Sequence, residues 1–167
     1  MTTEILTIDK GQCLTDVLPA IPANTIFDKT ITGCGATHSE IVNAARHSII
    51  IEPNIPVILG KKAEHPFLFA VYEGITKEDV KAYLAGEHDG YRKIITTPEG
   101  FDKKVLPAMH ELEIPVYKDY FLLFDECEKA IQDVGYRGDI YLPVEDFFKF
   151  ENKAMVSATP IVPSDPR

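Results

Sequence analysis

The chain has 167 residues, 45% of them apolar, and a formal net charge of −9. This length suits one domain, and the apolar fraction is sufficient to fill a single core. No stretch reaches the roughly 18 to 20 apolar residues that a membrane span requires, so we expect no membrane partner. The acidic surface repels phosphate backbones at long range, so we expect this domain alone to bind nucleic acid weakly at best.

The cysteine usage indicates a compartment. Cys13, Cys34 and Cys127 form no CxxC pair, and three cysteines cannot all pair with one another. Small secreted domains usually rely on paired cysteines, so this pattern favours a reducing environment. We therefore expect a cytoplasmic protein.

Short apolar runs alternate with helical patterns along the chain. Strands are predicted at 25–31, 48–52, 67–72, 93–96, 120–124 and 154–157, and helices at 37–46, 77–85, 100–111 and 128–134. Several strands are apolar throughout, which is typical of strands buried on both faces of a parallel sheet. Strands separated by helices predict right-handed βαβ units, and hence an α/β fold with helices on both faces of a mainly parallel sheet. Ligands of such sheets lie beyond the carboxyl ends of the strands.

A glycine-containing loop follows the first predicted strand. It is Thr32-Gly33-Cys34-Gly35-Ala36-Thr37. Two glycines between a strand and a helix allow a tight turn and let backbone N–H groups point at an anion. The alternative interpretation is an ordinary glycine-rich turn, because so short a pattern is not specific.

Two adjacent carboxylates end the strand predicted at 120–124. They belong to Asp125 and Glu126. In ATP hydrolysis one carboxylate at such a position can hold magnesium while its neighbour orients the attacking water. The alternative is a strand followed by an acidic helix start, which the helix dipole favours in any case.

The last predicted strand ends in Ser157-Ala158-Thr159, where two hydroxyls flank a small residue. Hydroxyls at this place can connect hydrogen-bond networks between neighbouring strand ends. A strand terminus closed by Thr159-Pro160 is the simpler interpretation when the segment is taken alone. The order of the three segments carries more information than any one of them.

That order and spacing resemble motifs I, II and III of the superfamily 2 helicases. Asp125-Glu126-Cys127-Glu128 resembles the DExx box, and Ser157-Ala158-Thr159 matches the family's SAT motif about thirty residues later. Two weaker similarities fall between the first and second motifs: Glu52-Pro53-Asn54 resembles motif Ia, and Thr96-Thr97-Pro98-Glu99-Gly100 resembles motif Ib. The resemblance implies a three-layer αβα sandwich of the RecA-like P-loop NTPase type, with residues 1–167 forming a single first lobe.

The resemblance also implies ATP and magnesium as cofactors and assigns roles to residues. Asp125 and Glu126 are the implied catalytic pair, and Thr37 and Asp125 the implied magnesium ligands. Ser157 and Thr159 would couple the strand ends. Nucleotide binding falls to Gly33, Cys34, Gly35, Ala36 and Thr37, and nucleic-acid binding to Pro53, Asn54 and Thr97.

The phosphate loop departs from the family pattern GxxxxGK[ST]. With Gly35 aligned, Thr30 replaces the first glycine and Ala36 replaces the lysine, whereas Thr37 keeps the magnesium position. The missing lysine normally contacts the β and γ phosphates, so we expect weak ATP binding. Lys29 and the pair Lys61-Lys62 are the lysines that could substitute for it.

Three functions remain open at this point. The leading hypothesis is the N-terminal ATPase lobe of a nucleic-acid-dependent helicase-like protein, weak or inactive alone, with a second RecA-like lobe in a longer protein or in a partner. The alternative is a pseudo-ATPase scaffold that keeps the fold without hydrolysing ATP, which Ala36 and Thr30 favour. The third is an unrelated flavodoxin-like domain whose motif matches are accidental.

Overall fold

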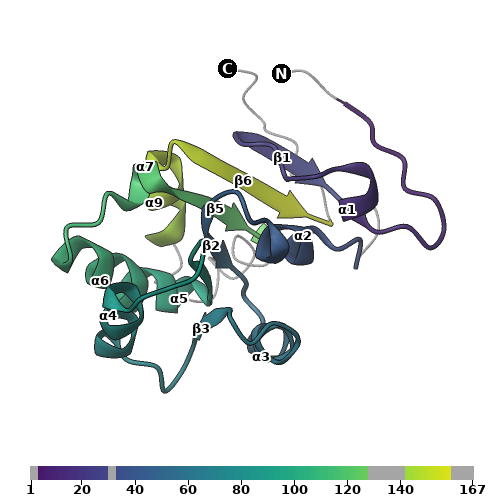
Figure 1. The fold of residues 1–167 in the computed structure, drawn as a ribbon. Coiled ribbons are helices and arrows are strands. Elements are labelled where there is room, and N and C mark those ends of the chain that lie inside the picture. Colours follow the sequence, from purple (N-terminus) through teal and green to yellow (C-terminus); the bar gives the residue numbers. More distant parts are fainter. Residues whose placement is uncertain (1–3, 30–32, 128–141, 159–167) are drawn as a thin grey trace.

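A six-stranded sheet forms the centre of the protein (Figure 1). The computed structural model describes residues 4–29, 33–127 and 142–158. The strand order is β1-β6-β5-β2-β4-β3, and every neighbouring pair is parallel. The strands are β1 (Thr25–Asp28), β2 (His47–Ile51), β3 (Phe69–Val71), β4 (Lys93–Thr96), β5 (Tyr120–Phe124) and β6 (Asn152–Ser157). Each of the six predicted strands has a counterpart, and the parallel sheet is confirmed; residues 30 and 31 of the strand predicted at 25–31 lie outside the described residues.

Helical segments connect the strands. They are α1 (Leu14–Val17), α2 (Ala36–Val42), α3 (Ile55–Glu64), α4 (Lys77–Ala85), α5 (Pro98–Gly100), the π-helical η1 (Phe101–Val105), α6 (Leu106–Glu111), α7 (Val116–Asp119) and α9 (Leu142–Lys149). The helix predicted at 128–134 lies outside the described residues. Among the helices that are described, none is long and apolar enough to cross a bilayer.

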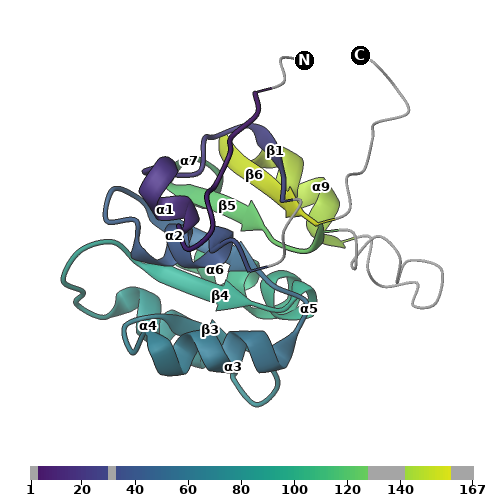
Figure 2. The same ribbon diagram turned by 90° about the vertical axis from the view of Figure 1, so that its right-hand side faces the viewer.

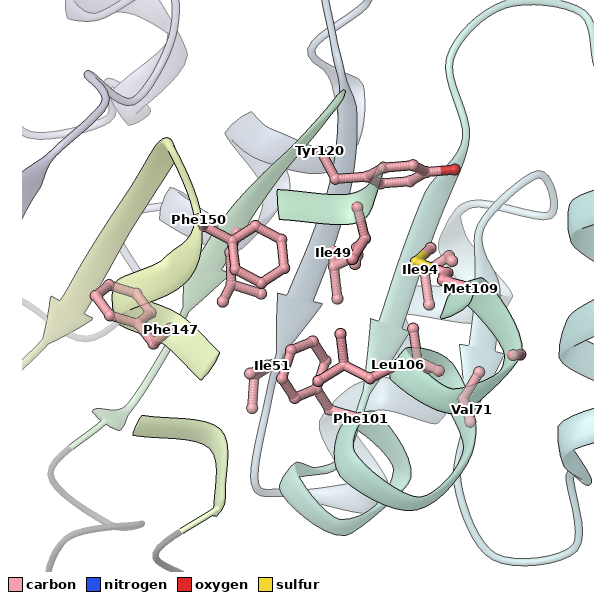
Figure 3. Close-up of a cluster of buried hydrophobic side chains, with 14 of the residues drawn as sticks. Ile49, Ile51, Val71, Ile94, Phe101, Leu106, Met109, Tyr120, Phe147 and Phe150 are labelled. Atoms are coloured by element: carbon pink, nitrogen blue, oxygen red, sulfur yellow. The ribbon is translucent and has the colours of Figure 1, made fainter. Parts of the chain in front are cut away.

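The sheet separates two apolar clusters, which makes the fold three-layered. On β5, Phe121 and Leu123 face the cluster under α1, α2 and α3, whereas Leu122 and Phe124 face the opposite cluster. Figure 3 shows this second cluster, in which side chains of η1, α6 and α9 pack onto β2 and β4. All five residues of β5 are buried, and the first charged side chain follows at Asp125.

Backbone pairing continues one residue past several strand ends and aligns them at one edge. The N–H of Asp125 donates to the carbonyl of Ile51 (3.0 Å), and the N–H of Lys29 donates to that of Ser157 (2.8 Å). Figure 2 shows β1, β6 and β5 side by side, and their carboxyl ends meet at this edge. The first, fifth and sixth strands, which lead into the three motif-like segments, therefore open together on one edge.

Several helices differ from the prediction. The helix predicted at 37–46 ends at Val42, and the sequence did not predict α1, α7 or α9. The helix predicted at 100–111 begins at Pro98 and contains the π-helical turn η1. Pro107 lacks the N–H that an α-helix would use there, which accounts for the local change in pairing. The sequence did not predict α3, because Pro56 and Gly60 resemble helix breakers. Pro56 lies in the first turn of α3, where a missing N–H has no cost.

Candidate functional site

Asp125 is the centre of a hydrogen-bonded cluster at the carboxyl edge of the sheet. It follows β5 directly and is 2% exposed. Its Oδ1 accepts hydrogen bonds from Lys29 Nζ (2.8 Å) and from the backbone N–H of Glu126 (2.9 Å). Its Oδ2 accepts a hydrogen bond from the hydroxyl of Thr37. The structure therefore brings together two residues 88 positions apart that the sequence assigned to one magnesium site.

The glycine loop places Thr37 against Asp125. Gly33 and Gly35 have φ angles of 79° and 91°, which side-chain-bearing residues rarely adopt. Gly35 directly precedes α2, so Thr37 is the second residue of that helix and is buried. Among the described residues, no atom lies within 4 Å of a Cβ placed on Gly33.

Glu126 turns back toward the same cluster. Its φ angle is 50°, in the left-handed region that is uncommon for residues other than glycine. The turn leaves its carboxylate 2.6 Å from Lys29 Nζ. A backbone strain of this kind is often found at functional sites, where the surrounding structure fixes an unfavourable conformation.

Lys29 supplies positive charge to this cluster. The sequence suggested it only as one of three lysines that could substitute for the missing P-loop lysine. It lies directly after β1, is 8% exposed and contacts both Asp125 and Glu126. Burial by itself would lower the pKa of Lys29, but the two carboxylates outweigh that effect and raise this pKa above its ordinary value. Lys29 therefore stays protonated at neutral pH.

The other candidate lysines are held elsewhere. Lys61 binds Glu64 on the same helix (2.8 Å). Lys62 donates to the carbonyls of Pro66 and Leu68, at 2.7 and 2.6 Å. Both lysines thus stabilise the C-terminal end of α3. Of the three candidate lysines, Lys29 is the one that contacts Asp125 and Glu126.

Glu52 is a third carboxylate at this edge; the sequence placed it in the stretch that resembles motif Ia but gave the residue itself no role. It is 2% exposed, and its Oε1 accepts two 2.9 Å hydrogen bonds from the backbone N–H and the side-chain amide of Asn54. Burial raises the pKa of Glu52 to about 7, and the charges of Asp125 and Glu126 add to this rise. Its position after β2, next to β5, was the available signal, because neighbouring strand ends lie side by side.

The residues that the resemblance assigned to nucleic acid already have local partners. Asn54 donates to Glu52, and Pro53 lies half-buried beside it. The Thr97 hydroxyl accepts a hydrogen bond from the N–H of Gly100 (3.0 Å) and thereby caps α5. A nucleic-acid role for Pro53, Asn54 and Thr97 stays a prediction.

The remaining predicted site residues have mixed surroundings. Ala36, in the position of the P-loop lysine, is buried in the apolar cluster that contains Leu14. The Cys34 carbonyl accepts a hydrogen bond from the N–H of Leu14 (3.0 Å), so the loop is joined to α1. Ser157 is buried on β6, between β1 and β5, and Thr159 lies outside the described residues.

Comparison with known proteins supports the fold. The chain is similar in structure to the helicase domain of Pyrococcus furiosus Hef, with a TM-score of 0.51 and 14% sequence identity. The match covers 86% of this chain but only 31% of that one. No protein-family model matches the chain, and no curated protein is significantly similar to it in sequence. The protein is therefore an α/β domain with the fold of a helicase RecA-like domain, and an identity this low shows the fold alone.

Proposed function

We propose that this protein is the ATP-binding lobe of a nucleic-acid-dependent, helicase-like ATPase, and that it hydrolyses ATP only together with a second RecA-like lobe. The observation that carries this proposal is the contact between the Thr37 hydroxyl and the Asp125 carboxylate at the carboxyl edge of the sheet. Ligands of parallel α/β sheets bind at this edge. The cluster therefore lies where a nucleotide site of this fold is expected.

The residues present fit magnesium and a nucleotide. Thr37 and Asp125 offer two adjacent oxygen ligands, which suits a hard divalent cation that keeps most of its water. Magnesium would neutralise charge on the phosphates, and Glu126 would orient the attacking water. The match spans about a third of the Hef structure, which supports the need for a second lobe to complete the site.

A specific observation also favours the pseudo-ATPase scaffold. Lys29 already neutralises part of the charge on Asp125 and Glu126, and the position of the P-loop lysine is a buried alanine. A cluster that is satisfied by its own ion pairs can persist as a structural feature of the fold. Only measured turnover separates this alternative from the ATPase.

The test is phosphate release by the natural full-length protein, with and without single-stranded nucleic acid. Replacing the proposed water-orienting base with an isosteric amide, Glu126→Gln, should leave nucleotide affinity nearly unchanged and slow turnover by about 10²- to 10⁴-fold. Asp125→Asn should also weaken magnesium-dependent binding. Glu111→Gln, on an exposed carboxylate of α6, is the matched control. Equal background rates for wild type and all variants would favour the scaffold.

Nucleic acid is the proposed activator, and this lobe should contribute little to its affinity. The net charge of −9 opposes a polyanion. Anisotropy of a labelled single strand should therefore show weak, salt-sensitive binding by the 167-residue chain. Tight binding at physiological salt would contradict this division of roles between the two lobes.

A further inference from the structure

The reach of Lys29 across the sheet edge is unusual for a side chain with a purely local role. Strands β1 and β5 do not pair, because β6 lies between them, and two strand spacings amount to roughly 10 Å. The backbone of Lys29 is fixed by its N–H bond to the Ser157 carbonyl. From this anchor the side chain extends over the end of β6 to Asp125 and Glu126.

The usual position for a phosphate-binding lysine is closed in this protein. Ala36 is 3% exposed and belongs to the apolar cluster that includes Leu14 and Ile41. A lysine at position 36 would have to displace these contacts to reach the site. The positive charge that the nucleotide site lacks at Ala36 is present in Lys29 instead.

We infer that Lys29 is the phosphate-binding lysine of this site, and that it exchanges its carboxylate partners for a nucleotide phosphate when magnesium binds Asp125. This inference rests on the proposed nucleotide-binding function and names the residue that replaces the missing P-loop lysine. Among the described residues, no atom within 4 Å of a Cβ placed on Gly33 stands in the way of a phosphate at the loop.

Charge balance is the reason for the exchange. Without ligand, the Lys29 ammonium offsets the two carboxylates, which would otherwise repel both each other and any phosphate. With magnesium bound to Asp125, that carboxylate would no longer need the Lys29 ammonium. Lys29 would keep its charge and would contact the nucleotide phosphate through a charge-assisted hydrogen bond. Magnesium and nucleotide should therefore bind cooperatively.

This mechanism predicts two opposite effects of one substitution. Lys29→Met removes the phosphate contact, so the affinity for magnesium-ATP should fall about tenfold to a hundredfold. The same change removes the ammonium that competes for Asp125, so the affinity for a divalent cation alone should rise. Cation binding would tighten for any lysine that neutralises these carboxylates, so the loss of magnesium-ATP affinity is the effect that identifies a phosphate contact.

The experiment measures both affinities on the 167-residue chain. Calorimetry gives the dissociation constant for magnesium-ATP, and Mn²⁺ binding without nucleotide, followed by electron paramagnetic resonance, gives that for the cation. Lys61→Met removes the same charge from a lysine that contacts Glu64 instead of the cluster, and should change neither constant. Urea unfolding of each variant checks that it is folded.

A second pair of variants covers the case in which Lys29→Met fails to fold because it removes the ammonium from two adjacent carboxylates. Glu126→Gln is compared with Lys29→Met/Glu126→Gln, in which a single uncompensated charge remains. The double variant should bind magnesium-ATP about tenfold or more weakly than Glu126→Gln and Mn²⁺ alone more tightly.

The outcomes separate this inference from the proposed function. Weaker magnesium-ATP binding together with tighter Mn²⁺ binding supports the inference. If wild type binds magnesium-ATP and the Lys29 variants bind it equally well, the inference is overturned and the proposed function stands. If wild type binds no magnesium-ATP at millimolar concentration, both are overturned and the scaffold is favoured.

Discussion

Burial of Glu52 beside two other carboxylates should make the stability of this domain depend on pH. The pKa of Glu52 is raised from its ordinary value of 4.5 to about 7. Between these two values the folded protein binds a proton that the unfolded chain has released. The protonated Glu52 therefore contributes fully to the unfolding free energy below pH 4.5. This contribution is lost as the pH rises through 7.

The size of this effect follows from the same two values. One pH unit corresponds to about 1.4 kcal/mol for one proton, so ionisation of Glu52 should cost about 3 kcal/mol of unfolding free energy between pH 4.5 and pH 8. Glu52→Gln keeps an oxygen that can accept from Asn54 but cannot ionise. The unfolding free energy of Glu52→Gln relative to wild type should therefore rise by nearly this amount when the pH is raised from 5 to 8.

The assay is urea unfolding of both proteins, followed by circular dichroism at pH 5 and pH 8. Comparing the two proteins cancels the titration of all other groups. Glu111→Gln is the control, because the hydrogen bond from Lys77 lowers the pKa of Glu111 and keeps it ionised throughout this range. A stability difference between Glu52→Gln and wild type that is the same at both pH values would refute the reasoning.

Two further predictions concern packing and buried charge. Gly100→Ala should destabilise the domain by about 1–3 kcal/mol in urea unfolding, because its Cβ would lie 2.6 Å from the Thr96 hydroxyl and 3.1 Å from the Val71 carbonyl. Gly60→Ala, on α3 with nothing within 4 Å of the added carbon, should instead stabilise it by about 0.5–1 kcal/mol, and equal effects of the two changes would contradict the packing argument. Arg46→Ala should cost about 3 kcal/mol in the same assay, since it removes two hydrogen bonds from a fully buried glutamate, Glu40. A loss below about 0.5 kcal/mol would show that the remaining partners of Glu40 suffice.

Local patterns were sufficient to predict most of the framework. The helix Lys77–Ala85 begins where it was predicted because Thr76 and Asp79 form a capping box, which is decided within four residues. The continuous apolar run Tyr120–Phe124 predicted a strand buried on both faces, and all five residues are buried. Both features depend on residues that are neighbours in the sequence, so they could be predicted without the tertiary structure.

The candidate site could be predicted only in part. The order of the motifs predicted that the glycine loop and Asp125 would meet, because parallel strands bring their carboxyl ends to one edge. The sequence could not show which lysine reaches the carboxylates, since Lys29 and the pair Lys61-Lys62 were all candidates without coordinates. It also could not show that Ala36 lies in an apolar cluster formed with α1.

The sequence by itself determined the fold class, the positions of the strands and the two carboxylates that follow β5. Strand burial and turn formation depend on short segments of the chain, so local patterns were enough to predict them. The tertiary structure alone decided the charge balance of the site. Placing β6 between β1 and β5 sets Lys29 opposite Asp125 and Glu126, and pairing β2 with β5 buries Glu52 next to them. Electrostatic interactions depend on distances through space and on burial, and neither is encoded in any local stretch of the chain.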